Sequence, residues 1–136
     1  MKKKLDFYII DDSDVNNYYT DDLLREFNFT KSVTIFTTAA EALQNLFRLL
    51  IENKKLPDVI LLDIRMPDMS GFEFIKNLEE KLNGEKAKTH VFILTSSQHH
   101  KDIQAFDQQE MAKEFLNKPL EKNVLLKTIQ AYFVVG

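Results

Sequence analysis

The chain has 136 residues, which fits one domain spanning residues 1–136 and a sizeable buried core. It has no cysteine, which rules out disulfides and thiolate metal sites and makes the cytoplasm the default expectation. The net charge of −3 arises from interspersed acidic and basic residues, which argues against direct nucleic-acid binding. No apolar run approaches the ~20 residues of a membrane span.

The first part of the chain alternates between strand and helix patterns. Residues 5–10 are rich in aromatic and β-branched residues, which predicts a strand, and they stop at an acidic cluster that begins with Asp11. Residues 15–27 repeat apolar side chains every three or four positions, which predicts a helix with one buried face. The apolar positions of that face are Val15, Tyr18, Tyr19, Leu23, Leu24 and Phe27. Residues 32–37 predict a short strand.

The middle of the chain centres on Asp63. Thr38 and Glu41 have the spacing of a capping box, which predicts the start of a helix that ends before Pro57. Four apolar residues then run directly into Asp63, as expected for a strand buried on both faces.

The segment that follows Asp63 is predicted to be a short, stiff loop. Pro67 fixes its own φ, and Gly71 can adopt backbone angles that other residues avoid. Ser70 and Glu73 again have capping-box spacing, which predicts the next helix.

The last third continues the alternation. The predicted elements are a buried strand at 91–94 that ends at Thr95, a less regular helix at 103–111, a short strand at 115–116 closed by Lys118-Pro119, and a helix at 124–133. Five β-then-α units imply a parallel sheet with helices on both faces.

Polar residues directly follow the apolar strands and should therefore converge on one edge of the sheet. These residues are Asp11, Asp12, Asp63, Thr95 and Lys118. Clustered carboxylates repel one another, so they call for a cation, and Mg²⁺ is the natural candidate for oxygen ligands. An aspartate can be a nucleophile that forms an acyl phosphate, while a hydroxyl and an ammonium can contact phosphoryl oxygens.

From residue 5 to residue 133 the sequence resembles the response-regulator receiver domains of two-component signalling. The resemblance rests on the order of these five polar residues and on the motif LLDIRMPDMSGFEF around Asp63. It implies an α/β fold of the flavodoxin-like, doubly wound (βα)5 type, with a five-stranded parallel sheet in the order 2-1-3-4-5. It also implies a cis peptide bond between Lys118 and Pro119.

The family's functional roles carry over to matching positions. By this resemblance, Asp63 is the phosphoacceptor, and Mg²⁺ is bound by Asp11, Asp12, Asp63 and the backbone carbonyl of Arg65. The resemblance also implies that Thr95 and Lys118 contact the phosphoryl group and that Phe115 is the aromatic switch. It further implies that Arg65 and Ser97 set the rate of hydrolysis.

The function implied is that of a stand-alone receiver without an output domain, a phosphorylation-dependent switch and not an enzyme. Its phosphodonor would be a histidine kinase or a histidine phosphotransfer protein. Output would pass through residues 100–133 to a downstream protein, with the chain a monomer or a phosphorylation-dependent dimer.

Two alternatives stay open. One is a receiver-like interaction module that no longer accepts phosphate, although such modules usually lose the acidic pair or the phosphoacceptor, and both are present here. The other is an aspartyl-phosphate phosphohydrolase with its nucleophile after the first strand. Asp12-Ser13-Asp14-Val15-Asn16 comes close to that pattern but lacks its hydroxyl residue.

Overall fold

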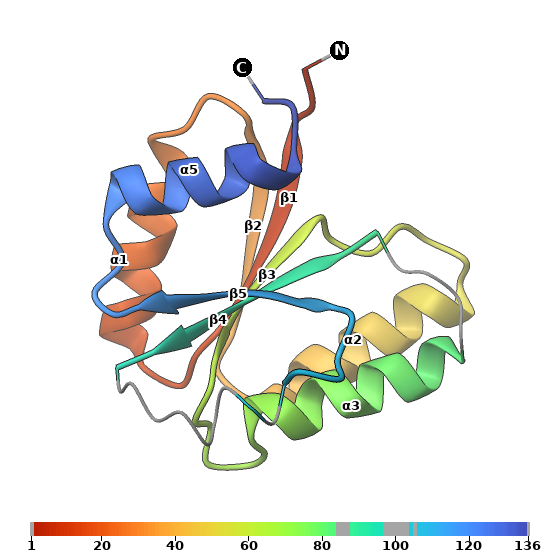
Figure 1. Cartoon of the computed structure of the whole chain (residues 1–136). Helices are drawn as coiled ribbons and strands as arrows, with labels where there is room; N and C mark the ends of the chain where they lie inside the picture. The colour runs from red at the N-terminus through yellow and green to blue at the C-terminus, as the bar shows by residue number, and fades with distance from the viewer. Residues whose placement is uncertain (1, 84–87, 97–103, 105, 136) are drawn as a thin grey trace.

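The computed structural model describes residues 2–83, 88–96, 104 and 106–135. These residues contain a five-stranded parallel sheet in the order β2-β1-β3-β4-β5, as predicted, with helices on both faces (Figure 1). The elements are β1 (Leu5–Ile10), α1 (Asp14–Arg25), β2 (Thr30–Phe36), α2 (Ala39–Ile51), β3 (Val59–Asp63), α3 (Gly71–Leu82), β4 (His90–Thr95), β5 (Ala112–Asn117) and α5 (Lys122–Tyr132). None of the helices in the described ranges is long and apolar enough to cross a membrane.

The helix expected over residues 103–111 falls partly outside the described residues. Residues 106–111 form turns, in which the N–H of Gln109 donates to the carbonyl oxygen of Phe106 at 3.0 Å. β5 extends over six residues, where only residues 115 and 116 were predicted. Parallel pairing with β4 accounts for the extra length, because backbone pairing includes residues whose side chains give no apolar signal.

Side chains of the central strands alternate between two cores, as strand geometry requires. In β1, Tyr8 and Ile10 pack with α2 and α3 on one face, whereas Phe7 and Ile9 pack with α1 and α5 on the other. β3 is buried along its whole length. This two-sided cover explains why the central strands are nearly continuous apolar runs.

Helix α1 follows the prediction only in its second half, where Leu23 and Leu24 are buried. Val15 and Tyr18 are 78% and 77% exposed, and Tyr19 is 46% exposed, so the prediction that these residues face the core was wrong. The polar Asn17 is buried in their place, and its side-chain amide donates to the carbonyl oxygen of Asp11 at 2.8 Å. Turning Asn17 inward directs its apolar neighbours outward, because successive residues of a helix are about 100° apart.

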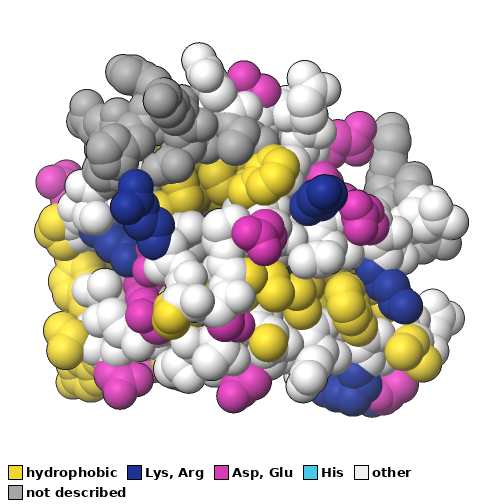
Figure 2. Space-filling model, turned by 90° about the horizontal axis from the view of Figure 1, so that it is seen from below, with side chains coloured by type: hydrophobic (Ala, Val, Ile, Leu, Met, Phe, Trp, Pro, Cys, Tyr) yellow, Lys and Arg dark blue, Asp and Glu magenta, His cyan; other side chains and the backbone are white. Residues whose placement is uncertain are grey.

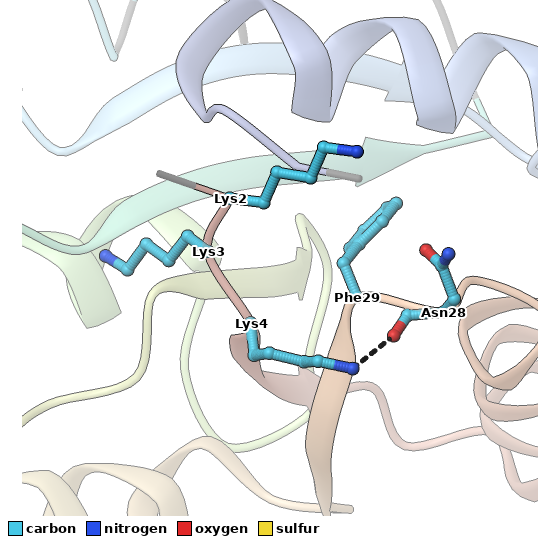
Figure 3. Close-up of a pocket in the computed structure, with 5 residues that line it drawn as sticks. All are labelled: Lys2, Lys3, Lys4, Asn28 and Phe29. Atoms are coloured by element: carbon cyan, nitrogen blue, oxygen red, sulfur yellow. Dashed lines mark hydrogen bonds between the residues drawn. The ribbon is translucent and has the colours of Figure 1, made fainter.

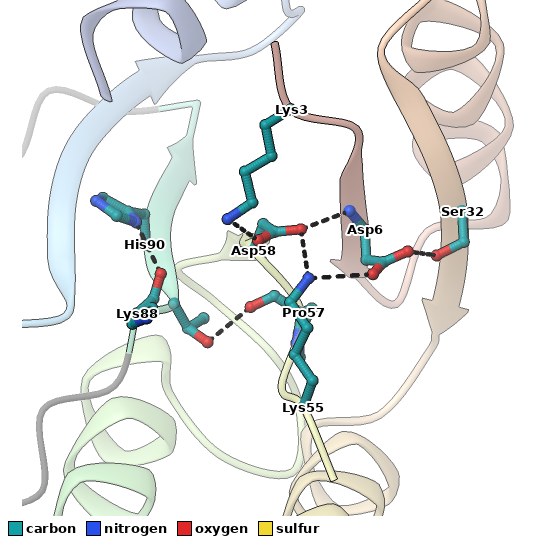
Figure 4. Close-up of polar contacts among 9 residues, drawn as sticks. Lys3, Asp6, Ser32, Lys55, Pro57, Asp58, Lys88 and His90 are labelled. Atoms are coloured by element: carbon teal, nitrogen blue, oxygen red, sulfur yellow. Dashed lines mark hydrogen bonds and ion pairs between the residues drawn. The ribbon is translucent and has the colours of Figure 1, made fainter. Parts of the chain in front are cut away.

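At the amino ends of the strands, a buried carboxylate holds several segments together (Figure 4). Asp58 accepts hydrogen bonds from the Lys3 ammonium at 2.7 Å, the Lys55 ammonium at 3.0 Å and the N–H of Asp6 at 2.8 Å. The Asp6 carboxylate in turn accepts from the Ser32 hydroxyl at 2.6 Å. Burial raises the pKa of Asp58, but the hydrogen bonds from Lys3, Asp6 and Lys55 outweigh it, and the net pKa is lowered.

A pocket of about 250 Å³ lies beside this network (Figure 3). It is lined by Lys2, Lys3, Lys4, Asn28 and Phe29. The Lys4 ammonium donates to the carbonyl oxygen of Asn28 at 2.9 Å, and Lys3 extends away to Asp58. Two of the three lysines thus bind groups of the protein itself, so the lysine run contributes to the fold.

We predict that Asp58→Asn lowers the free energy of unfolding at pH 7 by about 2 kcal/mol, since hydrogen bonds to a charged group each contribute ~1.5–3 kcal/mol. Because the folded-state pKa of Asp58 is lowered, the advantage of the wild type is full above the ordinary pKa of 3.8. The advantage is then lost as the pH falls through the folded-state pKa. Urea unfolding at neutral and acidic pH measures both effects.

The matched control is Asp21→Asn, which breaks the exposed Asp21–Arg25 ion pair at 2.8 Å. That substitution should change the free energy of unfolding by less than about 0.5 kcal/mol. Equal effects of the two substitutions would contradict the role given to Asp58.

Candidate functional site

Four polar side chains from four strands meet at the carboxyl edge of the sheet. Asp11 follows β1, Asp63 ends β3, Thr95 ends β4 and Lys118 follows β5. The Lys118 ammonium lies 3.1 Å from Oδ2 of Asp11 and 3.2 Å from Oδ2 of Asp63. One cation therefore joins two carboxylates that are 52 positions apart in the sequence.

Asp12 completes a cluster of three carboxylates. One oxygen from each of Asp11, Asp12 and Asp63 lies within 4.8 Å of the others. Asp11 and Asp63 are buried and Asp12 is exposed, so the cluster is open to solvent on the side of Asp12.

The electrostatics of the cluster favour a further cation. Burial raises the pKa of Asp63, the charge of Lys118 opposes this rise, and the charge of Asp11 adds to it, leaving the pKa raised. A nearby positive charge would stabilise the ionised carboxylates. Three carboxylate oxygens are also the hard ligands that Mg²⁺ prefers. The residues present therefore fit a magnesium ion.

The backbone fixes the position of Lys118. Its N–H donates to the carbonyl oxygen of Thr95 at 3.0 Å, which continues the pairing of β4 with β5. The peptide bond between Lys118 and Pro119 is cis, as predicted. Thr95 is only 5% exposed, so the residue lies in a largely enclosed position at the end of β4.

Two residues that the sequence analysis gave no role support Asp11. The N–H of Ser13 donates to Oδ1 of Asp11 at 3.0 Å, and the Ser13 hydroxyl caps α1 by accepting from the N–H of Asn16 at 3.2 Å. Asn17 holds the carbonyl oxygen of Asp11 from the first turns of α1. A serine before a helical pattern was an available capping signal. The role of Asn17 became visible only with the fold.

The loop that follows Asp63 folds back on itself. The N–H of Arg65 donates to Oδ1 of Asp63 at 3.3 Å, and Arg65 forms an antiparallel bridge with Ser70. A Cβ atom at Gly71 would lie 3.3 Å from Cα of Ile64 and 3.4 Å from the carbonyl oxygen of Asp63. Close backbone packing therefore explains why residue 71 is a glycine. Gly71 has a helical backbone as the first residue of α3. Gly71 therefore does not use the backbone angles that are open to glycine and avoided by other residues.

Three other residues had predicted roles: Arg65, Phe115 and Ser97. The Arg65 side chain is exposed. Phe115 is partly buried, and its ring packs edge-to-face on Phe106 with ring centroids 5.5 Å apart. Ser97 lies outside the described residues.

Comparison with known proteins gives a consistent result. Residues 7–130 match the family described as the response regulator receiver domain. The protein PilH of Pseudomonas aeruginosa is 32% identical over 81 residues, which cover 60% of this chain and 64% of PilH. The chain thus spans somewhat less than two thirds of PilH.

Solved structures have the same architecture. A two-component response regulator from Legionella pneumophila superposes with a TM-score of 0.78 at 29% identity, covering 95% of this chain and 98% of that one. A two component response regulator from Cytophaga hutchinsonii gives a TM-score of 0.84 at 25% identity, covering 96% and 98%.

Proposed function

Because the chain belongs to the response regulator receiver domain family, we propose that it is a phosphorylation-dependent switch of a two-component or phosphorelay system, with Asp63 as the phosphoacceptor. The observation that carries this proposal is the contact of the Lys118 ammonium with both Asp11 and Asp63 inside a cluster of three carboxylates. The buried Asp63 carboxylate is the nucleophile, and its charged neighbours prepare the site for a phosphoryl group.

The transfer is a displacement at phosphorus. A carboxylate oxygen of Asp63 forms the new P–O bond, the P–N bond of a phosphohistidine breaks, and the imidazole leaves after taking up a proton. Asp11, Asp12, Asp63 and the backbone carbonyl of Arg65 would hold Mg²⁺. The bound ion supplies positive charge that offsets the carboxylates and the phosphoryl oxygens.

Four further side chains have roles at the aspartyl phosphate in this proposal. Lys118 pairs with one phosphoryl oxygen, and the Thr95 hydroxyl donates to another. Arg65 and Ser97 set the lifetime of the phosphorylated state by controlling the rate of hydrolysis.

The two rival functions are less well supported. An interaction module that cannot accept phosphate would have no use for an intact acidic pair beside a buried aspartate. A phosphohydrolase would have its nucleophile after β1. The chain belongs instead to the receiver domains, which are signalling domains rather than classical enzymes.

We predict that acetyl phosphate adds one phosphoryl group to the wild type only when Mg²⁺ is present, because the crowded carboxylates otherwise repel the phosphodonor. Intact-mass spectrometry measures the labelling. Asp63→Asn should remain unlabelled, and excess chelator should abolish labelling of the wild type. Arg65→Ala should be labelled but should lose its phosphate at a different rate. Labelling of Asp63→Asn, or equal labelling in chelator, would refute the assignment.

The exposed apolar residues of α1 form the surface on which the phosphodonor protein docks in this proposal. Val15, Tyr18 and Tyr19 lie one to two turns beyond the acidic pair. The Tyr19 hydroxyl donates to the carbonyl oxygen of Leu120, two residues after Lys118. Seen from below, hydrophobic side chains gather at the edge over α1, beside interspersed acidic and basic ones (Figure 2). Exposed apolar clusters mark interaction surfaces, and this one adjoins the proposed site.

We therefore predict that Tyr18→Ser slows phosphotransfer from a histidine kinase that phosphorylates the wild type by about tenfold, the loss typical of an important interface tyrosine. Labelling by acetyl phosphate should be unchanged, because that donor needs no docking surface. Ile51→Ser is the control, since Ile51 is equally exposed, at 77%, at the far end of α2. Equal rates for both variants with the kinase would rule out docking on α1.

Output is proposed to leave through β5 and α5, within residues 100–133. Phosphorylation adds about −1.5 to −2 of charge at Asp63, which draws the Thr95 hydroxyl toward it and vacates space into which Phe115 turns. A partner that prefers this arrangement would then bind the phosphorylated form. The partner can be an effector, another copy of the chain or a phosphotransfer protein.

The output proposal predicts that beryllofluoride, which mimics the phosphoryl group, shifts amide resonances of β5 and α5 as well as those around Asp63. Two-dimensional NMR spectra with and without the ligand provide the measurement, and Asp63→Asn provides the control. Shifts confined to the residues around Asp63, with residues 112–132 unaltered, would exclude this route.

A further inference from the structure

The loop that carries Asp63 is bound to a second element through Asp68. Oδ1 of Asp68 accepts from the N–H of Ala39 at 3.2 Å, and Oδ2 accepts from the N–H of Ala40 at 2.8 Å. These are the first two N–H groups of α2, which have no partner within their own helix. Both oxygens of one carboxylate are therefore used, and the positive end of the helix dipole strengthens the contact.

The first turn of α2 has a cap of its own. The Thr38 hydroxyl accepts from the N–H of Glu41 at 3.2 Å. Thr38 and Asp68 thus divide the free N–H groups of the same helix end between them. Only Asp68 comes from the loop after Asp63, which makes its contact a link between the loop and α2.

Other restraints on this loop differ from the Asp68 contact. The bridge between Arg65 and Ser70 and the hydrogen bond from Gly71 to Ile64 connect the loop to itself. Met66 packs in the core, which resists withdrawal of the loop but gives little directional control. Two charge-assisted hydrogen bonds at defined distances do give such control.

We propose that Asp68 is a positioning residue that holds the loop between Asp63 and Gly71 in the geometry required for Mg²⁺ binding and phosphoryl acceptance. This inference rests on the proposed function and adds to it a residue that touches neither the carboxylate cluster nor Lys118. Asp68 acts by anchoring the loop against α2, and the backbone at Arg65 lies within the anchored segment.

The test compares Asp68→Ala with two control variants of the same helix end. Thr38→Ala removes a cap of α2 without touching the loop. Glu41→Gln removes one negative charge from the first turn of α2 without breaking a contact to the loop. Mg²⁺ affinity is measured by calorimetry with the metal alone, melting temperature by circular dichroism, and labelling by acetyl phosphate through intact mass.

Asp68→Ala should weaken Mg²⁺ binding by about tenfold, the lower end of the range for residues that orient metal ligands without binding the metal themselves. Its melting temperature should fall by a few degrees, as for Thr38→Ala, because each variant loses a helix cap. Thr38→Ala and Glu41→Gln should keep wild-type Mg²⁺ affinity. Asp68→Asn, which retains one acceptor oxygen, should be intermediate.

Three results would overturn the inference. Wild-type Mg²⁺ affinity in Asp68→Ala would leave Asp68 as a helix cap only. Equal weakening in Thr38→Ala would assign the effect to α2 stability, and equal weakening in Glu41→Gln would assign it to net charge. Failure of the proposed function is distinguishable, because the wild type itself would then neither bind Mg²⁺ nor become labelled at Asp63.

Discussion

The enclosure of two carboxylates at one sheet edge is the constraint on which the site depends. Two such charges about 4 Å apart repel by about 4 kcal/mol at an effective dielectric constant of ~20. The Lys118 ammonium, held between Asp11 and Asp63, offsets part of this repulsion. Parallel strands make the arrangement possible, because their carboxyl ends bring together residues that are distant in sequence.

The charged side chains at the two ends of the sheet are paired differently. At the amino ends, two carboxylates, Asp6 and Asp58, face two ammonium groups, Lys3 and Lys55, so that the formal charges balance. At the carboxyl ends, the Lys118 ammonium pairs with Asp11 and Asp63, and Asp12 lies in the same cluster of three carboxylates. The balanced end needs no ligand and can serve stability alone. The end with three clustered carboxylates gains stability when a cation binds there, so it is the end that can respond to one.

Features with a local sequence signal could be predicted from the sequence. Asp11, Asp63, Thr95 and Lys118 lie at the carboxyl edge of the sheet, as expected from the apolar run that precedes each of them. The start of α2 and that of α3 were read from Thr38 and Ser70, whose capping partners are three residues away.

Contacts that follow no regular sequence spacing were missed. In the first turns of α1, Asn17 faces inward to reach Asp11, a polar requirement that overrides the apolar pattern of Val15 and Tyr18. The hydrogen bonds of Asp68 to α2 join residues 28 and 29 positions apart, and no spacing rule predicts such a pair. The packing that requires Gly71 likewise appears only when the loop closes on Ile64.

The same loop leads directly into a chain of contacts that ends at Phe115. The loop ends at the first turn of α3, where the centroid of the Phe72 ring lies 6.0 Å from that of Phe106. The Phe106 ring packs in turn on Phe115. The carbonyl oxygen of Phe72 also accepts from the buried side chain of Gln109 at 3.0 Å, which ties the turns before β5 to α3.

A displacement of this loop would therefore reach β5 through packed rings as well as through Thr95 and β4. Closely packed interiors move by switching between discrete arrangements, because no empty space allows gradual movement. If phosphorylation of Asp63 shifts the loop, the three rings must repack together, and the surface beside Phe115 changes with them. The anchor at Asp68 would then limit loop movement on the α2 side and direct it toward Phe72, the side from which the proposed output surface is reached.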